Sequence, residues 1–295
     1  MSMKVVLWGL GLDYQKMKEQ IRKLCESGDL EVAGVTATTP PMQKEIDGWR
    51  VVSPIDLETL HIDKILICSF RYYREIRDYA LTLPGIRPDM PVPGWMVLNK
   101  VDPDEYRSLS EQKISILSNN CWGGVISKTL CLENRSPLKN CWLSDEDYLK
   151  ILQDPEHYLL KSDPVFEQWL PDITDHKTLF PQLLLDDVRI YCVHDTDPDI
   201  AIGNWMRRRE KLDLDNLFVM FVPTRPESEI LFSKMDRYPK KLCVVPWEPQ
   251  CDISIHPKRL PGEKSFYDTA VRIAFPWGAF EYYSPVRLLL SGEHY

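Results

Sequence analysis

The chain of 295 residues lacks the signals of several specialised protein classes. Its eight cysteines include no C-x-x-C pair, and most stand inside apolar runs, so neither a zinc site nor a disulfide framework is indicated. No run approaches the ~20 consecutive apolar residues of a membrane span. The amino terminus runs directly into a strand pattern instead of a cleavable signal. We therefore expect a cytoplasmic protein with free thiols, no bound metal and no membrane span.

The sequence also lacks a basic excess. It has 36 lysines and arginines against 44 aspartates and glutamates, which gives a formal net charge of -8. A nucleic-acid-binding protein needs a basic face to displace counterions, so no nucleic-acid partner is expected. Hydrophobic residues make up 44% of the chain, which is enough for a buried core, and the length favours two domains.

Strand and helix patterns alternate in the first third of the chain. Short apolar runs at residues 4–8, 31–36 and 64–69 predict strands, and helical spacing follows the first and third of them. Such alternation predicts parallel pairing with right-handed crossovers. Residues 1–108 therefore predict a Rossmann-like domain, which ends at a polar connector near residues 102–110.

Gly9 and Gly11 resemble the start of a dinucleotide-binding fingerprint, but the fingerprint is incomplete. Tyr14 occupies the position of the third glycine, which normally allows close packing of helix on strand. Residues 36–39 (TATT) supply no acidic residue for a ribose hydroxyl. The turn therefore predicts a site for another nucleotide or phosphate compound, or a purely structural turn, and the sequence identifies no cofactor.

A second alternating series fills residues 109–295 and predicts a C-terminal α/β domain. Strands are expected at residues 114–117, 188–194, 217–222 and 241–246, and helices at 124–132, 199–211 and 227–235, with a further helix capped by Ser144. Beyond Trp247, prolines and aromatic residues break the pattern into short pieces. We expect an irregular tail there that packs back on the second domain, because a flexible tail would carry fewer aromatics.

The heptapeptide SNNCWGG, residues 118–124, joins the expected strand 114–117 to a helix. Glycines at such a turn let backbone amides of the first helical turn converge on an anion, and asparagines add donors. This interpretation predicts a ligand site formed by Asn119, Asn120, Trp122, Gly123 and Gly124. In the structural alternative, an asparagine caps the helix and the tryptophan fills the core.

Cys121 lies in the same turn, where the positive end of a helix favours a thiolate and nucleophilic attack is conceivable. A nucleophile needs a base, and no histidine stands close to Cys121 in the sequence. His157 and His194, each at the end of an expected element, are the candidates for acid-base catalysis. The alternative is that both histidines are structural.

Arg208 is the arginine of the run 207–209 that shares a helical face with Ala201, Trp205 and Leu212. A buried guanidinium needs a carboxylate, a phosphate or carbonyl partners; ligand binding is one alternative, and a structural pair with Asp186, Asp187 or Asp215 is the other. Arg207 and Arg209 are expected on a solvated face. Asp195-Thr196-Asp197 has the D-x-D form of a metal site, but Asp197 before Pro198 is better explained as a helix cap.

At residues 118–124, 205–209 (WMRRR) and 215–221 (DNLFVMF), the sequence resembles the bacterial domain-of-unknown-function family 1919. Members of this family are often labelled exopolysaccharide biosynthesis proteins, and some carry a companion domain that the first part of this chain resembles. The resemblance implies a small anionic sugar compound as ligand, such as a sugar nucleotide or sugar phosphate, and polysaccharide-assembly enzymes as partners. Two hypotheses follow: a sugar-compound-binding protein that acts as a transferase, or a non-catalytic metabolite-binding or scaffold protein.

Overall fold

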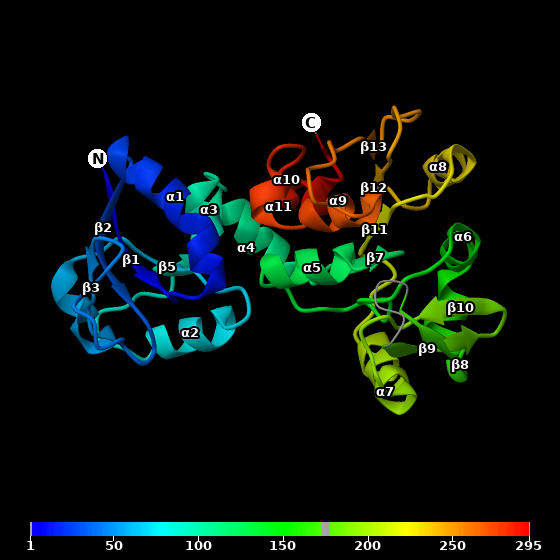
Figure 1. Cartoon of the computed structure of the whole chain (residues 1–295), viewed down its shortest axis with the longest axis horizontal. Helices are drawn as coiled ribbons and strands as arrows, with labels where there is room; N and C mark the ends of the chain where they lie inside the picture. Colours follow the sequence, from blue (N-terminus) through cyan, green and yellow to red (C-terminus); the bar gives the residue numbers. More distant parts are fainter. Residues whose placement is uncertain (1, 173–177, 295) are drawn as a thin grey trace. The chain divides into compact units, whose positions relative to one another are not determined.

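The computed structural model describes residues 2–172 and 178–294, and the chain forms two compact units, Met1–Tyr106 and Arg107–Tyr295 (Figure 1). A domain boundary at residue 108 stays a proposal. In each unit a parallel sheet is flanked by helices, so the α/β class predicted from the sequence is confirmed.

The first unit is built on a four-stranded parallel sheet of order β2-β1-β5-β6. Its elements in chain order are β1 (Met3–Trp8), α1 (Leu12–Glu26), β2 (Leu30–Thr36), β3 (Glu45–Ile46), β4 (Trp49–Arg50), the 3-10 helix η1 (Pro54–Leu60), β5 (Lys64–Ile67), α2 (Tyr73–Ala80), β6 (Pro91–Pro93) and α3 (Gly94–Leu98). The three strands predicted from apolar runs are β1, β2 and β5. The order reverses direction beside β1, and ligands of open α/β sheets bind at such a reversal.

The second unit contains a four-stranded parallel sheet of order β13-β12-β11-β7. Helix α4 (Pro103–Glu111) precedes β7 (Ser115–Ser118) and α5 (Trp122–Thr129), and the later strands are β11 (Leu217–Phe221), β12 (Lys241–Val244) and β13 (Ser254–Ile255). Every residue of these four strands is buried, as expected for parallel strands covered on both faces.

An antiparallel sheet of order β10-β9-β8 packs in the same unit and was not predicted. It consists of β8 (Val165–Pro171), β9 (Leu179–Leu185) and β10 (Val188–Tyr191), and it is flanked by α6 (Asp145–Gln153), the π-helical turn η2 (His157–Lys161) and α7 (Pro198–Arg209). The strand expected at 188–194 is therefore shorter and joins this sheet. β8 is almost wholly exposed and so has no alternation of buried residues, and β9 contains Pro181, which argues against a strand.

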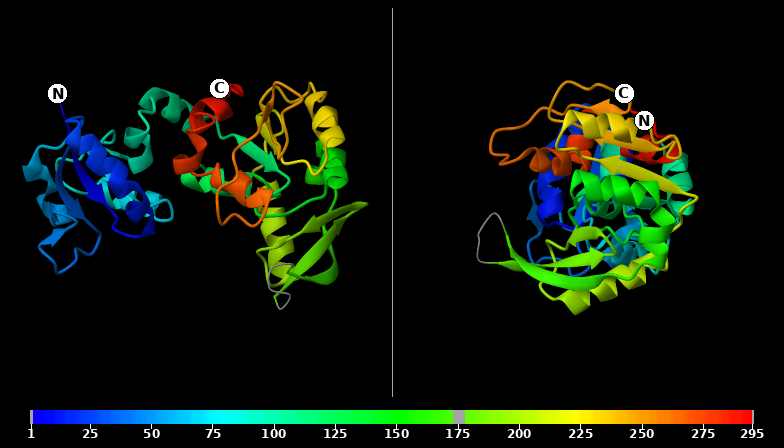
Figure 2. Two further views of the ribbon diagram at one scale, coloured as in Figure 1. Left: turned by 45° about the horizontal axis from the view of Figure 1, so that its top comes forward. Right: turned by 90° about the vertical axis from the view of Figure 1, so that its right-hand side faces the viewer.

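One hydrophobic core lies between the two sheets of the second unit. It gathers residues from β7, α6, β9, β10, α7 and β11, including Leu117, Leu183, Trp205 and Phe221. Figures 1 and 2 show the antiparallel sheet and the C-terminal helices on opposite sides of the parallel sheet. Helix α8 (Pro226–Ser233) follows β11. Within the described ranges, no helix has both the length and the apolar character that crossing a membrane requires.

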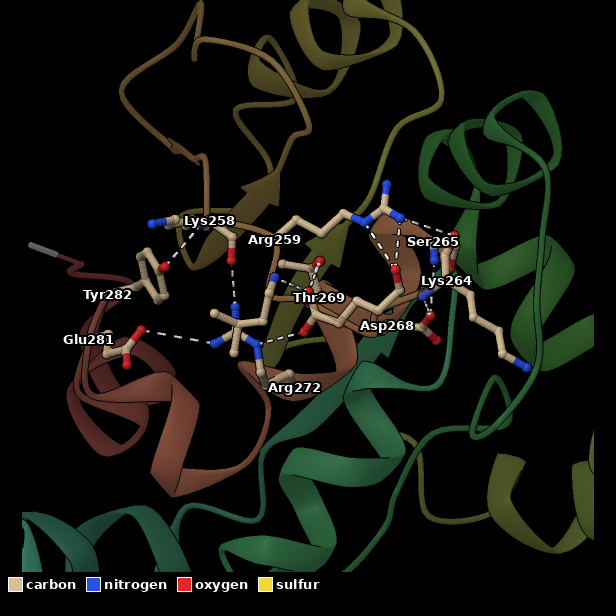
Figure 3. Close-up of polar contacts among 11 residues, drawn as sticks. Lys258, Arg259, Lys264, Ser265, Asp268, Thr269, Arg272, Glu281 and Tyr282 are labelled. Carbon is tan, nitrogen blue, oxygen red and sulfur yellow. Dashed lines mark hydrogen bonds and ion pairs between the residues drawn. The ribbon is translucent and has the colours of Figure 1, made fainter.

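The C-terminal segment packs back on the second unit and contains β13 and three short helices, α9 (Phe266–Arg272), α10 (Pro276–Ala279) and α11 (Pro285–Ser291). A polar network holds this segment together (Figure 3). Glu263 accepts hydrogen bonds from Arg272 Nε at 2.7 Å, Thr269 Oγ1 at 2.7 Å and the Leu260 N–H at 2.8 Å. The Arg272 and Glu263 side chains are only 16% and 12% exposed, so the pair is largely shielded from water.

Candidate functional site

The 118–124 turn links β7 to α5, and its asparagines bond within the protein. The side-chain amide of buried Asn119 donates to the Val222 carbonyl at 2.9 Å and accepts from the Val222 N–H at 3.0 Å. This pairing prolongs the contact of β7 with β11 beyond the strand ends. Asn120 Oδ1 accepts from the Trp122 N–H at 2.8 Å, so it caps α5. Both asparagines have structural roles, and their ligand-binding role stays a prediction.

The two glycines of the turn are in tight contact with their surroundings. A Cβ atom on Gly123 would lie 2.7 Å from Ser118 Oγ, and one on Gly124 would lie 2.3 Å from Asn140 Oδ1. The Gly123 N–H donates to Ser118 Oγ at 3.0 Å. Like the Trp122 N–H, this amide was expected to face an anion but already has a hydrogen-bond partner within the protein. Trp122 is fully buried, stacks on Phe218 and donates to the Tyr283 hydroxyl at 3.2 Å.

Cys121 is the residue of this turn that is not fully buried. Its Sγ lies 3.0 Å from Nε2 of His194, an exposed residue that follows β10 and is 73 positions away in the chain. The structure therefore brings together two of the three residues predicted for catalysis. Among the described residues, no partner contacts Nδ1 of His194, so the pair lacks the third, orienting group of a catalytic triad.

Two opposing effects act on the Cys121 thiol. Burial, with a smaller contribution from Cys141, raises the pKa of Cys121 to about 11. Cys121 is also the N-cap residue of α5, where the positive end of the helix favours a thiolate. A thiolate at neutral pH therefore depends on His194 accepting the proton.

Residues 139–143 connect this turn to Arg208. The Leu143 N–H donates to the Asn119 carbonyl at 3.0 Å, and the Asn140 side chain covers Gly124. Arg208 Nη1 donates to the Lys139 carbonyl at 3.2 Å. Arg208 and the 118–124 turn therefore contact the same short segment.

Four cations gather around this segment and form what we call the basic cluster: Lys128, Lys139, Arg207 and Arg208. Burial lowers the pKa of Lys139, and the charges of the other three lower it further. Burial also lowers the pKa of Arg208, against the opposing influence of Cys141 and Asp195. In the part of the chain that the structure describes, no ion pair joins any of the four to a carboxylate. Asp195 offsets part of the Arg208 charge without forming an ion pair, so the cluster is an incompletely compensated positive site on an acidic protein.

Two of the three carboxylates considered as partners of Arg208 bond to other residues. Asp186 lies 2.9 Å from His157 Nε2, and Asp187 accepts from Lys150 Nζ at 2.8 Å. Arg208 donates to a backbone carbonyl, which is one of the kinds of partner expected for it. Among the described residues, no ion pair joins it to Asp186, Asp187 or Asp215, and its role in ligand binding stays a prediction.

His157 belongs to a different network. Its Nε2 lies 2.9 Å from Asp186 and 3.4 Å from the Ser162 hydroxyl, so one ring nitrogen faces both groups. In a catalytic triad, one ring nitrogen of the histidine contacts the nucleophile and the other contacts the carboxylate. Here Nε2 contacts both groups, so this arrangement is not formed. The catalytic role of His157 stays a prediction. Arg209, expected on a solvated face, instead binds the Ser162 carbonyl at 3.0 Å and Asp163 at 2.8 Å.

The glycine turn of the first unit lies at the end of β1, where the strand order reverses. Gly9 has a φ of +97°, and its N–H donates to the Thr36 carbonyl at 3.0 Å. Gly11 is the N-cap residue of α1. Tyr14 is buried and donates to Asp47 at 2.8 Å, so a core tyrosine fills the place of the third glycine. The phosphate-binding role of Gly9 and Gly11 stays a prediction.

The D-x-D sequence is explained by the start of α7. Asp197 accepts from the N–H groups of Asp199 and Ile200 at 2.8 and 3.1 Å, which confirms the predicted cap. Asp195 accepts from Asn204 at 3.4 Å. Within residues 2–172 and 178–294, no three His, Cys, Asp or Glu side chains are placed to hold a metal ion.

Lys139, Cys141 and Cys192 adjoin the site and were not predicted for it. Lys139 and Cys141 lie between α5 and α6, and Cys192 follows β10. No spacing in the sequence relates them to Cys121, because strand pairing and loop packing bring them together. Only a prediction of the contact between residues 139–143 and the 118–124 turn would have found them.

Two family models match the chain. Residues 95–253 match the family described as Domain of unknown function (DUF1919), and residues 1–88 match the one described as C2185-like, N-terminal. A Haemophilus influenzae protein described as uncharacterized is 30% identical over 139 residues, which cover 47% of this chain and 64% of that protein. The chain therefore spans less than two thirds of this relative. Because the first match covers more than half of the sequence, the chain belongs to the domain of unknown function family DUF1919.

Proposed function

We propose that the second unit binds a small anionic sugar compound, a sugar phosphate or sugar nucleotide, at the basic cluster. The observation that carries this proposal is the absence, among the described residues, of any carboxylate ion pair to Lys128, Lys139, Arg207 or Arg208. The protein has a net charge of -8, so its carboxylates could have neutralised the cluster. Guanidinium and ammonium groups that lie near one another without a carboxylate ion pair are suited to a phosphate.

We infer a sugar in the ligand because residues 118–124 resemble a family whose members are often labelled exopolysaccharide biosynthesis proteins. Polysaccharide-assembly enzymes are accordingly the partners that we propose. The phosphate part comes from the charges alone. The two parts are therefore tested separately, with inorganic phosphate, a sugar 1-phosphate and a nucleotide sugar.

Calorimetric titration of the full chain tests this proposal. We expect a sugar 1-phosphate or nucleotide sugar to bind, and Arg208→Ala and Lys139→Ala each to weaken binding about tenfold, which is the worth of one charged hydrogen bond. Lys234→Ala is the matched control, because Lys234 is an exposed lysine of the same unit outside the cluster. Equal affinity in the parent and in both cluster variants would refute the proposal.

A second candidate function is group transfer through Cys121, and the 3.0 Å contact with His194 favours it. His194 would take the thiol proton, and Cys121 would attack an electrophilic centre of the compound bound at the cluster. Iodoacetamide should label Cys121 selectively, and Cys121→Ser should bind the ligand but fail to turn it over. Binding without any reaction at Cys121 would instead favour a non-catalytic metabolite-binding or scaffold protein.

A further inference from the structure

Two buried cysteines face each other across a short antiparallel contact. Trp142 and Tyr191 form an isolated bridge and exchange both backbone hydrogen bonds, with N···O distances of 2.9 and 3.0 Å. The neighbouring pair, Cys141 and Cys192, therefore occupies a non-hydrogen-bonded position, where directly opposite Cα atoms are about 4.5 Å apart in a regular ladder. A disulfide spans such a Cα separation.

The side chains of this pair also meet. Cys192 is the largest influence that raises the pKa of the Cys141 thiol, and the Cys141 Sγ itself donates to the Lys139 carbonyl at 3.7 Å. Their residues are 4% and 2% exposed, so no oxidant dissolved in water reaches them directly. Both thiols are free in the structure. The pair can be joined by a disulfide, but it needs a route to solvent.

Cys121 supplies that route. Residues 139–143 contact the 118–124 turn at two points: the Leu143 N–H donates to the Asn119 carbonyl at 3.0 Å, and the Asn140 side chain covers Gly124. Cys141 lies between these two contacts, and its charge acts on the Cys121 thiol. Cys121 is half-buried and has His194 at 3.0 Å. Cys141 therefore lies between an accessible, base-assisted thiol and a fully enclosed one.

Arg208 supplies positive charge to the same cluster. Its guanidinium, held by the Lys139 carbonyl at 3.2 Å, interacts favourably with the thiolates of Cys141 and Cys192. A thiolate is the attacking group in thiol-disulfide exchange. Cys192 and burial raise the pKa of Cys141 well above its usual range, and Arg208 offsets part of this rise. The arginine therefore lowers the cost of forming the thiolate that the exchange step requires.

We propose that Cys121, Cys141 and Cys192 form a redox site that reacts with a hydroperoxide and stores the oxidation as a Cys141–Cys192 disulfide. Cys121 is the peroxide-reactive thiol, Cys141 resolves it and Cys192 completes the buried bond. This proposal is independent of the binding of an anionic sugar compound.

His194 takes the Cys121 proton, the thiolate attacks one oxygen of the hydroperoxide, and the O–O bond breaks to leave a sulfenic acid and an alkoxide, which takes the proton from His194 and departs as an alcohol. The Cys141 sulfur attacks the Cys121 sulfur, and the hydroxide that leaves takes the Cys141 thiol proton and becomes water. The Cys192 sulfur then attacks the Cys141 sulfur, and Cys121 leaves as a thiolate that receives the Cys192 proton through His194. One hydroperoxide thus oxidises two thiols to one disulfide, with an alcohol and water as products.

Peptide mapping without reductant, after exposure of the full chain to hydrogen peroxide, tests the proposal. In the parent protein we expect a Cys141–Cys192 linkage and the loss of two of the eight thiols. Cys121→Ser should slow its formation about tenfold, because the buried pair loses its accessible partner. Cys192→Ala should stop the relay at a Cys121–Cys141 linkage. Cys25→Ser in the first unit is the control and should leave the rate unchanged.

Two outcomes would overturn the proposal. One is a parent protein that loses thiols to peroxide without forming the Cys141–Cys192 linkage. The other is a Cys121→Ser protein that forms the linkage at the parental rate. The first outcome is measured on the unaltered chain, so it does not depend on the folding of any variant.

Discussion

Cys121 and His194 illustrate how one turn can be structural and still present a reactive group. The turn around Cys121 is fixed by buried hydrogen bonds: Ser118 Oγ and Asn120 Oδ1 accept from backbone N–H groups, and the Asn119 side-chain amide donates to the Val222 carbonyl. These bonds fix the backbone and hold the Cys121 side chain at the N-terminus of α5. The backbone of the turn therefore loses little further conformational entropy when Cys121 reacts, which lowers the entropic cost of the reaction.

The close packing of Gly124 gives a prediction at the same scale. Gly124→Ala should destabilise the protein by about 1–3 kcal/mol, the usual cost of overpacking, because the new Cβ would lie 2.3 Å from Asn140 Oδ1. Gly203→Ala is the matched control, since nothing lies within 4 Å of its Cβ position and it is exposed in α7. The control should be neutral or more stable, because alanine favours a helix. Thermal unfolding measures both, and a Gly124→Ala protein that melts with the parent would contradict the packing argument.

Asparagine and glycine at a strand-to-helix turn could be predicted as an anion site, yet the structure gives them internal partners. The sequence cannot show that Val222 satisfies Asn119, because they are 103 residues apart. It likewise cannot show that His194 approaches Cys121. The capping roles of Ser144 and Asp197 were predictable, since each depends on residues two or three positions away.

At the scale of elements, local patterns predicted the longer parallel strands β1, β2, β5, β7, β11 and β12. They missed the short strands β6 and β13, and the polar connector expected near residues 102–110 forms the helix α4. They failed for the antiparallel sheet, because β8 exposes both of its faces and β9 carries a proline. The contact of residues 139–143 with the 118–124 turn also has no local signature. It is this contact, made by a loop, that joins Arg208 to Cys121, so the candidate site depended on the least predictable element.

The network around Glu263 gives a pH-dependent prediction (Figure 3). Burial alone would raise the pKa of Glu263, but hydrogen bonds from Thr269, the Leu260 N–H and Arg272 outweigh it, and the folded-state pKa lies below the usual 4.5. A depressed folded pKa contributes stability above the unfolded pKa, and this is lost as the pH falls through the folded value. Glu263→Gln should therefore cost about 2 kcal/mol at pH 7.

The difference in stability between Glu263→Gln and the parent should shrink as the pH falls from about 4.5 through the lower folded-state pKa, because the Glu263 carboxylate takes up a proton first in the unfolded chain and then in the folded protein. Urea unfolding at a series of pH values measures it. Glu156→Gln is the control, because Glu156 forms an exposed ion pair with Lys161, and little change is expected. A Glu263→Gln difference that stays constant with pH would contradict this account.

At the scale of the whole molecule, the two units have separate sheets and separate internal packing. We predict two unfolding transitions in calorimetry, since each unit has its own core. A sugar phosphate that binds the basic cluster should raise the midpoint of one transition and leave the other unchanged, because ligand stabilises only the unit that holds it. A single transition whose calorimetric and van't Hoff enthalpies agree would contradict the prediction.

Arg208 has one further consequence that follows from its position. The same guanidinium belongs to the basic cluster and interacts with Cys141 and Cys192. If anion binding and oxidation of the cysteine pair are coupled through this charge, thermodynamic linkage requires that the coupling free energy be the same in both directions. An anion held by Arg208 would therefore shift the midpoint potential of the cysteine pair, and oxidation of the pair would change the anion's affinity by the same factor. Through Arg208, the affinity of the protein for the anion would therefore depend on whether the Cys141–Cys192 pair is reduced or oxidised.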